Sequence, residues 1–114
     1  MSIREQMRKG TTTVILLNLL AEAEQPMYGY EIIQELEAQS EGYFRFKEGL
    51  IYPRLHELER QGLLRSEWRG EAGSRRRKFY RITEKGRRRL ETELRSWQVF
   101  TENVNRLLGV ETAP

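Results

Sequence analysis

The first stretch of hydrophobic positions predicts a helix that is buried on most of its sides. Over residues 5–24, apolar side chains run from Val14 to Leu20 with only Asn18 between them, and they cover almost the whole circumference of a helix. Pro26 ends this helix, because proline disfavours helical backbone in the residue before it. We therefore expect the first helix to be central to the fold.

Two shorter amphipathic helices are predicted next. Residues 29–40 and about 48–61 each carry one apolar stripe at helical spacing. Pro53 is compatible with the later helix if it lies in the first turn, where its missing N–H would have had no partner. Gly62 marks the end of that helix, since glycine readily adopts the left-handed backbone found after a helix.

Beyond Gly62 the apolar and polar residues no longer follow helical spacing but alternate, which predicts a β-hairpin over residues 63–82. The two alternating segments flank the sequence Gly-Glu-Ala-Gly-Ser at 70–74, which is rich in turn-forming residues. Trp68, in the first of these segments, is interpreted as a packing residue of the hairpin.

The last apolar stripe predicts one long helix over residues 83–109, with Thr83 as its N-cap. With about 25 residues at 1.5 Å each, this helix would be about 37 Å long, more than a domain of this size covers with its own chain. A second copy of the chain in a symmetric homodimer is the simplest way to cover the rest of this apolar stripe. The residues expected in the dimer interface are Leu90, Leu94, Trp97, Phe100, Val104, Leu107 and Leu108.

The order of these elements predicts a mainly α protein with a small β-hairpin: a winged helix-turn-helix plus a long C-terminal dimerisation helix. The predicted DNA-binding domain spans residues 1–82, with the wing at 63–82. The dimerisation helix spans 83–109, and a flexible tail spans 110–114.

Composition excludes several other classes of protein. The chain has no cysteine, so disulfides, thiolate metal sites and thiol nucleophiles are excluded. The single histidine, His56, can form neither a metal cluster nor a nucleophile–histidine pair. With no paired acids or phosphate-binding loop either, we predict no enzyme activity, cofactor or metal. No apolar stretch approaches the ~20 residues needed to cross a bilayer, and no signal peptide is recognisable, so we expect a cytoplasmic protein without a membrane partner.

Positive charge is concentrated in the middle of the chain. The net charge of +3 divides into −3 for residues 1–40, +5 for 41–82 and +1 for 83–114. Four cations stand together from Arg75 to Lys78, at the end of the predicted hairpin loop, where they can approach phosphates or the minor groove without being buried. Basic runs often serve only solubility, but this run lies on the element that a winged helix directs at DNA.

In this motif the third helix enters the major groove. Its outward residues are expected to include Tyr52, Arg54, His56 and Arg60, with Tyr52 and Arg54 favoured by position. The alternative is a solvated face of mixed charge, because glutamates stand among the basic residues. The residues expected to contact DNA are Lys47, Tyr52, Arg54, Arg75, Arg76, Arg77 and Lys78.

Trp97, midway along the stripe of the last helix, has two interpretations. One is a large anchor in the core of the dimer interface. The other is a stacking platform for a flat aromatic ligand between subunits, because a two-fold axis would bring two indoles close together.

Three segments resemble the PadR family of bacterial transcriptional regulators, and the resemblance spans residues 13 to about 98. They are VILLNLLAEAEQPMYGYEI, GLIYPRLHELERQGLL and RRRKFYRITEKGRRRL, the last being similar to the family's wing strand and the dimerisation helix that follows. The short, multidrug-binding members are the most similar, through TVILLN, EWRGE and the Ser-Trp pair at 96–97. By resemblance, the DNA residues are Tyr52 with its helix and Arg76, Arg77 and Lys78 on the wing.

The resemblance also implies a dimer with a flat hydrophobic pore at its interface, in which Trp97 stacks on the bound compound. The pore residues carried over by position are Met7, Val14, Asn18, Leu94 and Trp97. Leu50 departs from the family, which usually has a small hydroxyl residue there, so a phosphate contact at that position is lost. Leu94 replaces an aromatic residue of the multidrug-binding members, which weakens the case for the same ligands.

The residues and the resemblance together predict a homodimeric, sequence-specific transcriptional repressor. It would bind a pseudo-palindromic operator in double-stranded DNA and be released by a planar aromatic compound at the dimer interface. The alternative is a winged-helix protein-interaction module that does not bind DNA. That alternative explains the fold and the dimer helix but leaves the basic wing without a role.

Overall fold

The computed structural model describes residues 3–70 and 75–110, with side chains from residue 10 onward. Most of the loop expected at 70–74 and of the tail expected at 110–114 lies outside the described residues.

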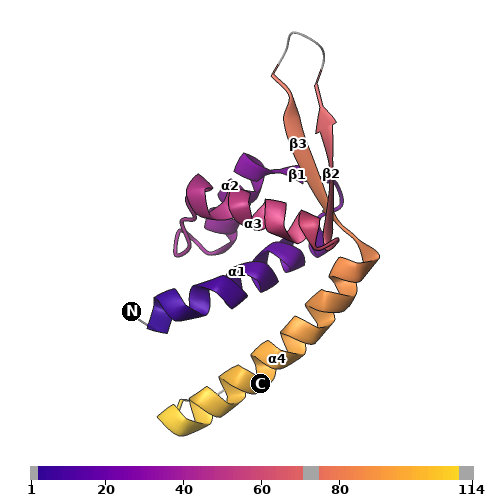
Figure 1. Cartoon of the computed structure of the whole chain (residues 1–114). Coiled ribbons are helices and arrows are strands. Elements are labelled where there is room, and N and C mark those ends of the chain that lie inside the picture. Colours follow the sequence, from indigo (N-terminus) through magenta and orange to yellow (C-terminus); the bar gives the residue numbers. More distant parts are fainter. Residues whose placement is uncertain (1–2, 71–74, 111–114) are drawn as a thin grey trace.

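Within the described part of the chain, four helices and three short strands form the fold (Figure 1). The helices are α1 (Ile3–Glu22), α2 (Gly29–Gln39), α3 (Glu48–Arg60) and α4 (Glu84–Leu108), and the strands are β1 (Met27–Tyr28), β2 (Leu64–Arg69) and β3 (Arg77–Ile82). The predicted helices and hairpin are confirmed, with ends shifted by one or two residues. None of the described helices is long and apolar enough to cross a membrane.

The sheet contains one strand that the sequence pattern did not predict. β1 pairs antiparallel with β3, with Met27 opposite Tyr80 and Tyr28 opposite Phe79, and β2 pairs with the other edge of β3. Two residues are too few to show alternation, and the preceding Pro26 signals only the end of the first helix. The short strand joins the base of the wing to the start of α2, while the far end of the hairpin projects from the body (Figure 1).

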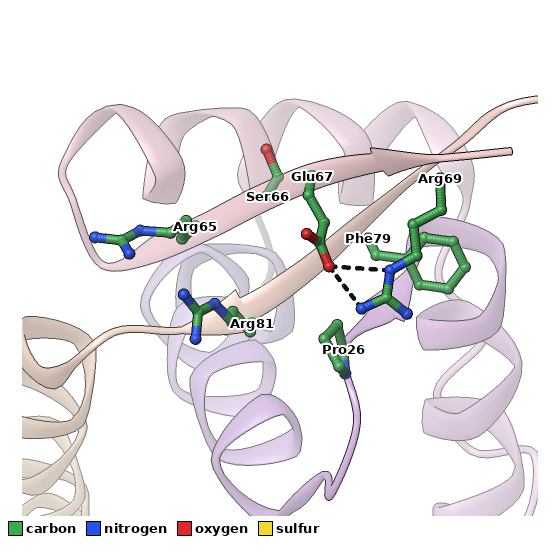
Figure 2. A pocket seen from close by; sticks show the side chains of 7 residues that line it. All are labelled: Pro26, Arg65, Ser66, Glu67, Arg69, Phe79 and Arg81. Atoms are coloured by element: carbon green, nitrogen blue, oxygen red, sulfur yellow. Dashed lines mark hydrogen bonds and ion pairs between the residues drawn. The ribbon is translucent and has the colours of Figure 1, made fainter.

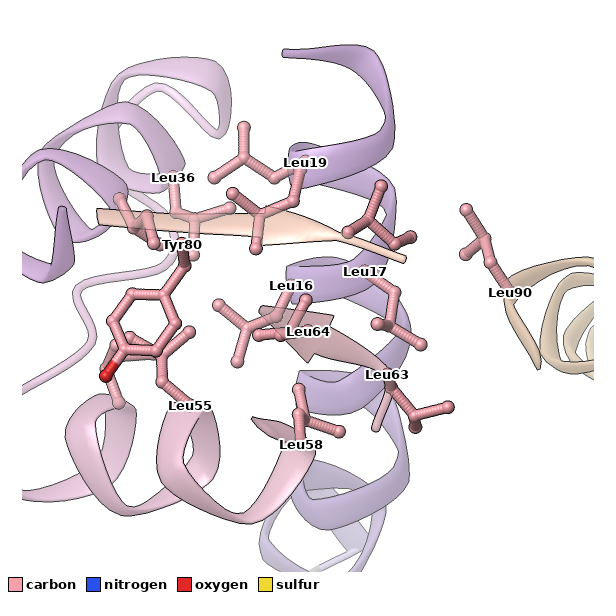
Figure 3. Close-up of a cluster of buried hydrophobic side chains, with 14 of the residues drawn as sticks. Leu16, Leu17, Leu19, Leu36, Leu55, Leu58, Leu63, Leu64, Tyr80 and Leu90 are labelled. Carbon is pink, nitrogen blue, oxygen red and sulfur yellow. The ribbon is translucent and has the colours of Figure 1, made fainter. Parts of the chain in front are cut away.

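The hydrophobic core lies between α1, α2, α3 and one face of the sheet (Figure 3). The fully buried side chains are Leu16, Leu17, Ile32, Ile51, Leu55, Leu63, Tyr80 and Thr12. The central position of α1 is thereby confirmed. Leu50 is half-buried and packs against this core, so its apolar side chain has a structural reason.

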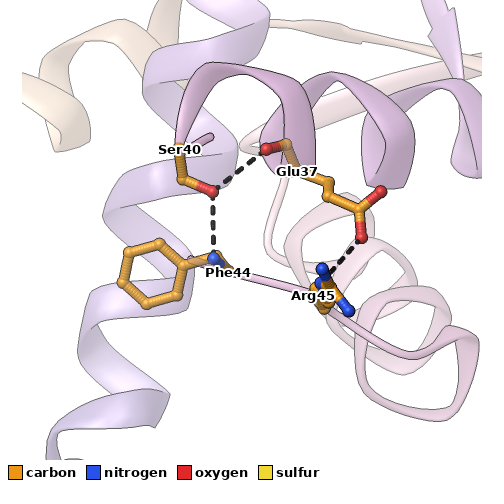
Figure 4. Close-up of polar contacts among 4 residues, drawn as sticks. All are labelled: Glu37, Ser40, Phe44 and Arg45. Carbon is orange, nitrogen blue, oxygen red and sulfur yellow. Dashed lines mark hydrogen bonds and ion pairs between the residues drawn. The ribbon is translucent and has the colours of Figure 1, made fainter. Parts of the chain in front are cut away.

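Short polar contacts hold the turn between α2 and α3 (Figure 4). Ser40 Oγ accepts the N–H of Phe44 at 2.9 Å and donates to the carbonyl of Glu37 at 3.3 Å. The Nε atom of Arg45 lies 3.4 Å from the Glu37 carboxylate. Gly42 has a φ of 82°, in the left-handed region that glycine enters at little cost. These contacts hold the connector against the end of α2.

The first turns of α4 are tied to the end of α3. Thr83 Oγ1 accepts the N–H of Gly86 at 3.0 Å, which confirms Thr83 as the N-cap, and it donates to the carbonyl of Gly62 at 2.7 Å. Gly86 lies so close to Leu63 that a Cβ atom at residue 86 would overlap the Leu63 carbonyl oxygen. Beyond Leu90, which is buried in the core, α4 diverges from α1 (Figure 1).

Candidate nucleic-acid interface

The exposed face of α3 differs from the one favoured by the sequence pattern. Beyond Glu48 at the first position, the exposed residues of α3 are Gly49, Pro53, His56 and Arg60, at i, i+4, i+7 and i+11. Tyr52 and Arg54 are half-buried, and because they are two residues apart on a helix they point to different sides. The structure therefore places His56 and Arg60 farther outward than Tyr52 and Arg54.

Local packing explains why Tyr52 is not fully exposed. A Cβ atom at Gly29, the first residue of α2, would overlap the Tyr52 ring, so the ring lies directly against that helix. The charge of Arg60 is partly compensated by an ion pair with Glu57, one turn earlier on α3. Lys47 is exposed at the N-cap of α3.

The four cations of the wing point in two directions. Arg75 and Arg76 are exposed ahead of β3, and Arg77 is exposed at its start, with its guanidinium 4.5 Å from the centre of the Tyr28 ring. Successive strand residues point to opposite faces, so the next residue, Lys78, points toward α3. The run therefore divides into three exposed arginines and one lysine directed at the body of the protein.

Lys78 forms an ion pair with Glu59 of α3, with 2.9 Å between Nζ and Oε1. Ser66 of β2 donates a hydrogen bond to the other oxygen of the same carboxylate. The side chains of Lys78 and Glu59 are only 26% and 30% exposed, respectively. We call Glu59, Ser66 and Lys78 the wing strut, because they join α3 to both strands of the hairpin.

The wing strut shifts the pKa of both charged partners. The hydrogen bond to Glu59 raises the pKa of Lys78 above its usual value, against the effect of partial burial. Partial burial would raise the pKa of Glu59, but hydrogen bonds from Ser66 and Lys78, together with the positive charge of Lys78, lower it overall.

These shifts set the pH range in which the strut stabilises the fold. A carboxyl group whose pKa is lowered on folding stabilises the folded protein fully at pH values above its unfolded pKa of about 4.3. This stabilisation is lost as the pH falls through the pKa of the folded state. A lysine whose pKa is raised on folding stabilises the folded protein fully at pH values below its unfolded pKa of about 10.4. This stabilisation is lost as the pH rises through the pKa of the folded state. The pair should therefore contribute fully from about pH 5 to about pH 10.

Replacing Glu59 with Gln is expected to lower the free energy of unfolding at pH 7 by about 1 kcal/mol, because the amide keeps the shape but loses the charge that pairs with Lys78. The difference from the unchanged protein should shrink at about pH 3, where the carboxyl is increasingly protonated. Urea unfolding at both pH values measures this. Glu67→Gln is the matched control, since Glu67 pairs with Arg69 on the exposed face of the hairpin. An equal effect of Glu59→Gln at both pH values would contradict an ionic strut.

Trp68 corrects one interpretation of the sequence. Its side chain is 58% exposed, so the prediction that it packs in the hairpin was wrong. It lies opposite Lys78 in the strand register and therefore on the face of the hairpin that looks toward α3. The alternating pattern of the sequence predicts which face of the hairpin Trp68 occupies. It does not predict that the hairpin extends beyond the hydrophobic core at this residue, which leaves the side chain exposed.

The last helix carries an apolar face that the described part of its own chain does not cover. Leu94, Trp97, Phe100, Leu107 and Leu108 are exposed, reaching 86% at Leu107, and Val104 is half-buried. The rings of Trp97 and Phe100 lie 6.1 Å apart. Leu90, the first residue of the predicted interface, is instead buried in the core of its own chain.

The residues expected to line a ligand pore have different surroundings in the single chain. Leu94 and Trp97 lie on the apolar face of α4. Val14 packs against the core, and Asn18 lines a hollow between α1, α2 and the connector before α3. The side chain of Met7 lies outside the part of the chain whose side chains the structure describes. The pore therefore stays a prediction.

The three-helix body, the projecting hairpin and the long final helix define the chain as a winged helix-turn-helix protein. A family model described as the transcriptional regulator PadR-like family matches residues 16–92. The chain belongs to this family of transcriptional regulators.

Known proteins agree with this assignment. The transcriptional regulator Rv3488 of Mycobacterium tuberculosis is 34% identical over 99 residues, which cover 86% of this chain and 89% of the relative. A PadR family transcriptional regulator from Eggerthella lenta has a similar structure, with a TM-score of 0.80 and 34% identity over 96% of this chain and 91% of the other. Bacillus subtilis PadR in complex with operator DNA has a similar fold, with a TM-score of 0.65 at 23% identity, covering 74% of this chain and 46% of that one.

Proposed function

We propose that the chain is a homodimeric repressor of transcription that binds a specific DNA sequence. The observation that carries this proposal is the wing, where Arg75, Arg76 and Arg77 are exposed near the projecting end of the hairpin. Arginines in that position can reach phosphates without the cost of being buried. The similar fold of Bacillus subtilis PadR, whose structure was solved with operator DNA, supports a DNA partner for this chain.

Under this proposal the wing and α3 have different tasks. The exposed arginines contact backbone phosphates and supply affinity, whereas side chains of α3 contact base edges and select the sequence. His56 and Arg60 face outward on α3, and Tyr52 and Arg54 flank them. Lys78 contributes through the wing strut, by holding the hairpin at a fixed angle to α3.

Changing Arg76 and Arg77 together to Ala is expected to weaken DNA binding at least tenfold at low salt, because each protomer loses two phosphate contacts. The slope of log affinity against log salt should fall in magnitude by about 2 to 4 for the dimer. Gel shifts over a salt series measure both quantities. The control is Arg87→Ala with Arg88→Ala, which removes two exposed arginines from α4. Unchanged affinity and slope in the Arg76/Arg77 variant would contradict the role of the wing.

The uncovered face of α4 supports the homodimer. A second copy related by a two-fold axis would bury the same residues from both chains, as closed symmetric dimers do. The α3 helices of the two subunits would then enter the major groove about one turn of DNA, ~34 Å, apart. The operator should accordingly be a pseudo-palindrome.

We also propose that a planar aromatic compound releases the repressor by binding at the dimer interface. Trp97 supports this, since its indole is partly exposed on the apolar face beside Phe100. A ligand can release DNA only if it binds one dimer conformation better than the other. The tie between the start of α4 and the end of α3 offers a route by which a change in the α4 pairing alters the angle between the two wings.

Single-tryptophan variants test the stacking role. In the Trp68→Phe variant, Trp97 is the remaining tryptophan. Planar dyes should bind this variant saturably and quench its indole fluorescence. The same dyes should bind Trp97→Ala at least about tenfold more weakly, because base-like stacking on an indole contributes on the order of 1–3 kcal/mol. If quenching and affinity survive in Trp97→Ala, the stacking platform is wrong.

A further inference from the structure

The outer face of the sheet, which points away from α3, carries a row of rings and charged groups that ends at Arg77 of the wing. Strand alternation places Glu67 and Arg69 of β2 on this face, and Phe79 and Arg77 of β3 lie opposite them. Glu67, Arg69 and Phe79 line one side of the pocket drawn in Figure 2. Tyr28 of β1 lies opposite Phe79 on its other side and completes the row.

Tyr28 is held in place by both its backbone and its ring. Its backbone pairs with Phe79 of β3, and its N–H donates to the carboxylate of Glu31 in α2 at 3.3 Å. Its half-buried ring meets the Phe79 ring edge-on, with 5.4 Å between the ring centres and 69° between the ring planes. The Tyr28 ring is therefore a fixed surface at the junction of β1 and α2.

Phe79, which supports this ring, is itself covered. The Arg69 guanidinium lies 4.8 Å from the centre of the Phe79 ring. Arg69 donates to Glu67 Oε1 through Nε at 2.9 Å and through Nη2 at 2.6 Å, so its charge is compensated within the row. The row thus has one engaged arginine at the Glu67 end and Arg77 at the other end.

Arg77 lies over the fixed Tyr28 ring while its side chain stays exposed. Its Cζ atom is 4.5 Å from the ring centre, a distance at which the face of an aromatic ring attracts a cation. None of the carboxylates that the structure describes forms an ion pair with Arg77. A guanidinium that lies over a ring keeps N–H donors at its edge for a planar or tetrahedral oxyanion. Arg75 and Arg76 are exposed too, but neither lies over a ring of the described residues.

We propose that Tyr28 is a positioning residue for DNA binding, which holds the Arg77 guanidinium beside the start of α2 so that its N–H groups meet one backbone phosphate. The inference rests on the DNA-binding function proposed above. A free arginine side chain loses rotamer freedom when it contacts a phosphate, and this loss weakens binding. Arg77 is already ordered by the ring before DNA arrives. It therefore fixes where the phosphate lies relative to α2, whereas Arg75 and Arg76 attract the backbone without this restraint.

Binding of a fluorescein-labelled duplex of random sequence at low salt tests this role, because phosphate contacts do not depend on sequence. Tyr28→Leu should weaken binding about fivefold or more, because each protomer of the dimer must then order one more side chain. Tyr28→Phe keeps the ring and should restore the affinity of the unchanged protein.

A double-mutant cycle separates positioning of Arg77 from general support of the fold. In an Arg77→Ala background, Tyr28→Leu should cause no further loss of duplex affinity, because the group that it positions is absent. Arg76→Ala is the matched background, since it removes the neighbouring exposed arginine and leaves the Tyr28–Arg77 contact intact. Tyr28→Leu should cause its full loss there.

Side-chain order in the unchanged protein gives a second test that needs no substitution of Tyr28. NMR relaxation of the arginine Nε–H groups, measured without DNA, should show Arg77 more ordered than Arg76. The two signals are assigned by their absence in Arg77→Ala and Arg76→Ala.

Three results would overturn the proposal. One is an Arg77 side chain as mobile as that of Arg76. Another is an equal loss from Tyr28→Leu in the Arg77→Ala and Arg76→Ala backgrounds, which would mean that Tyr28 only supports the fold. The third is weaker binding by Arg77→Ala without any loss in Tyr28→Leu, which would leave the DNA-binding proposal intact. Failure of the unchanged protein to bind the duplex would contradict the DNA-binding proposal itself, and the positioning role with it.

Discussion

Replacing Phe100 with Asp is expected to dissociate the proposed homodimer and to weaken DNA binding about 100-fold or more. Phe100 lies on the uncovered apolar face of α4, with its ring 6.1 Å from that of Trp97. A carboxylate there would be buried without a partner in the dimer, which costs several kcal/mol in each subunit. The DNA affinity falls as well, because a monomer loses the gain from binding two linked half-sites.

Sedimentation equilibrium and gel shifts measure the two effects of Phe100→Asp. Asn103→Asp is the matched control, because it adds the same charge to α4 at an exposed position whose side chain is hydrogen-bonded to Val99 and Arg106 of the same helix. This control should remain dimeric. A Phe100→Asp protein that sediments as a dimer would show that the apolar face of α4 is not the interface.

Replacing Gly86 with Ala is expected to destabilise the protein by about 2 kcal/mol or more, although alanine normally favours a helix over glycine by about 1 kcal/mol. The added Cβ would overlap the carbonyl oxygen of Leu63 and approach Cγ1 of Ile82 at 2.7 Å. Backbone and core must both move to make room. The melting temperature should therefore fall by roughly 10 °C.

Thermal unfolding at one fixed protein concentration measures the Gly86→Ala effect, because the stability of a dimer depends on concentration. Gly10→Ala is the control, since a Cβ atom at that position in α1 meets nothing within 4 Å. It should raise the melting temperature slightly. If Gly86→Ala behaves like Gly10→Ala, the start of α4 does not pack closely against Leu63 and Ile82.

The helices could be predicted from the sequence because their signals are local. Thr83 and Gly62 mark helix ends through their own backbone chemistry, and apolar spacing identifies the buried face of each helix. β1 could not be predicted, because Met27 and Tyr28 form a strand only by pairing with β3, more than fifty residues later. Such pairing depends on the tertiary fold.

The candidate site was predictable in outline but not in its division of tasks. The four wing cations look equivalent in the sequence, yet alternation turns Lys78 toward Glu59, which is distant along the chain. On α3, neighbouring elements decide which residues are exposed: α2 covers part of Tyr52 through Gly29, while His56 stays open. The register of the hairpin also depends on the fold, because only the pairing of β2 with β3 brings Arg65 opposite Arg81.

Selection of bound duplexes from a random pool, followed by footprinting, tests the central proposal most directly. A homodimeric DNA-binding regulator should enrich one pseudo-palindrome, with two protected half-sites about one helical turn, ~34 Å, apart. The variant with Arg76 and Arg77 changed to Ala should enrich it poorly, and the Arg87/Arg88 control should enrich it normally. No enrichment at low salt would contradict DNA binding and favour a protein-interaction module, while a single unrepeated half-site would contradict the two-fold dimer.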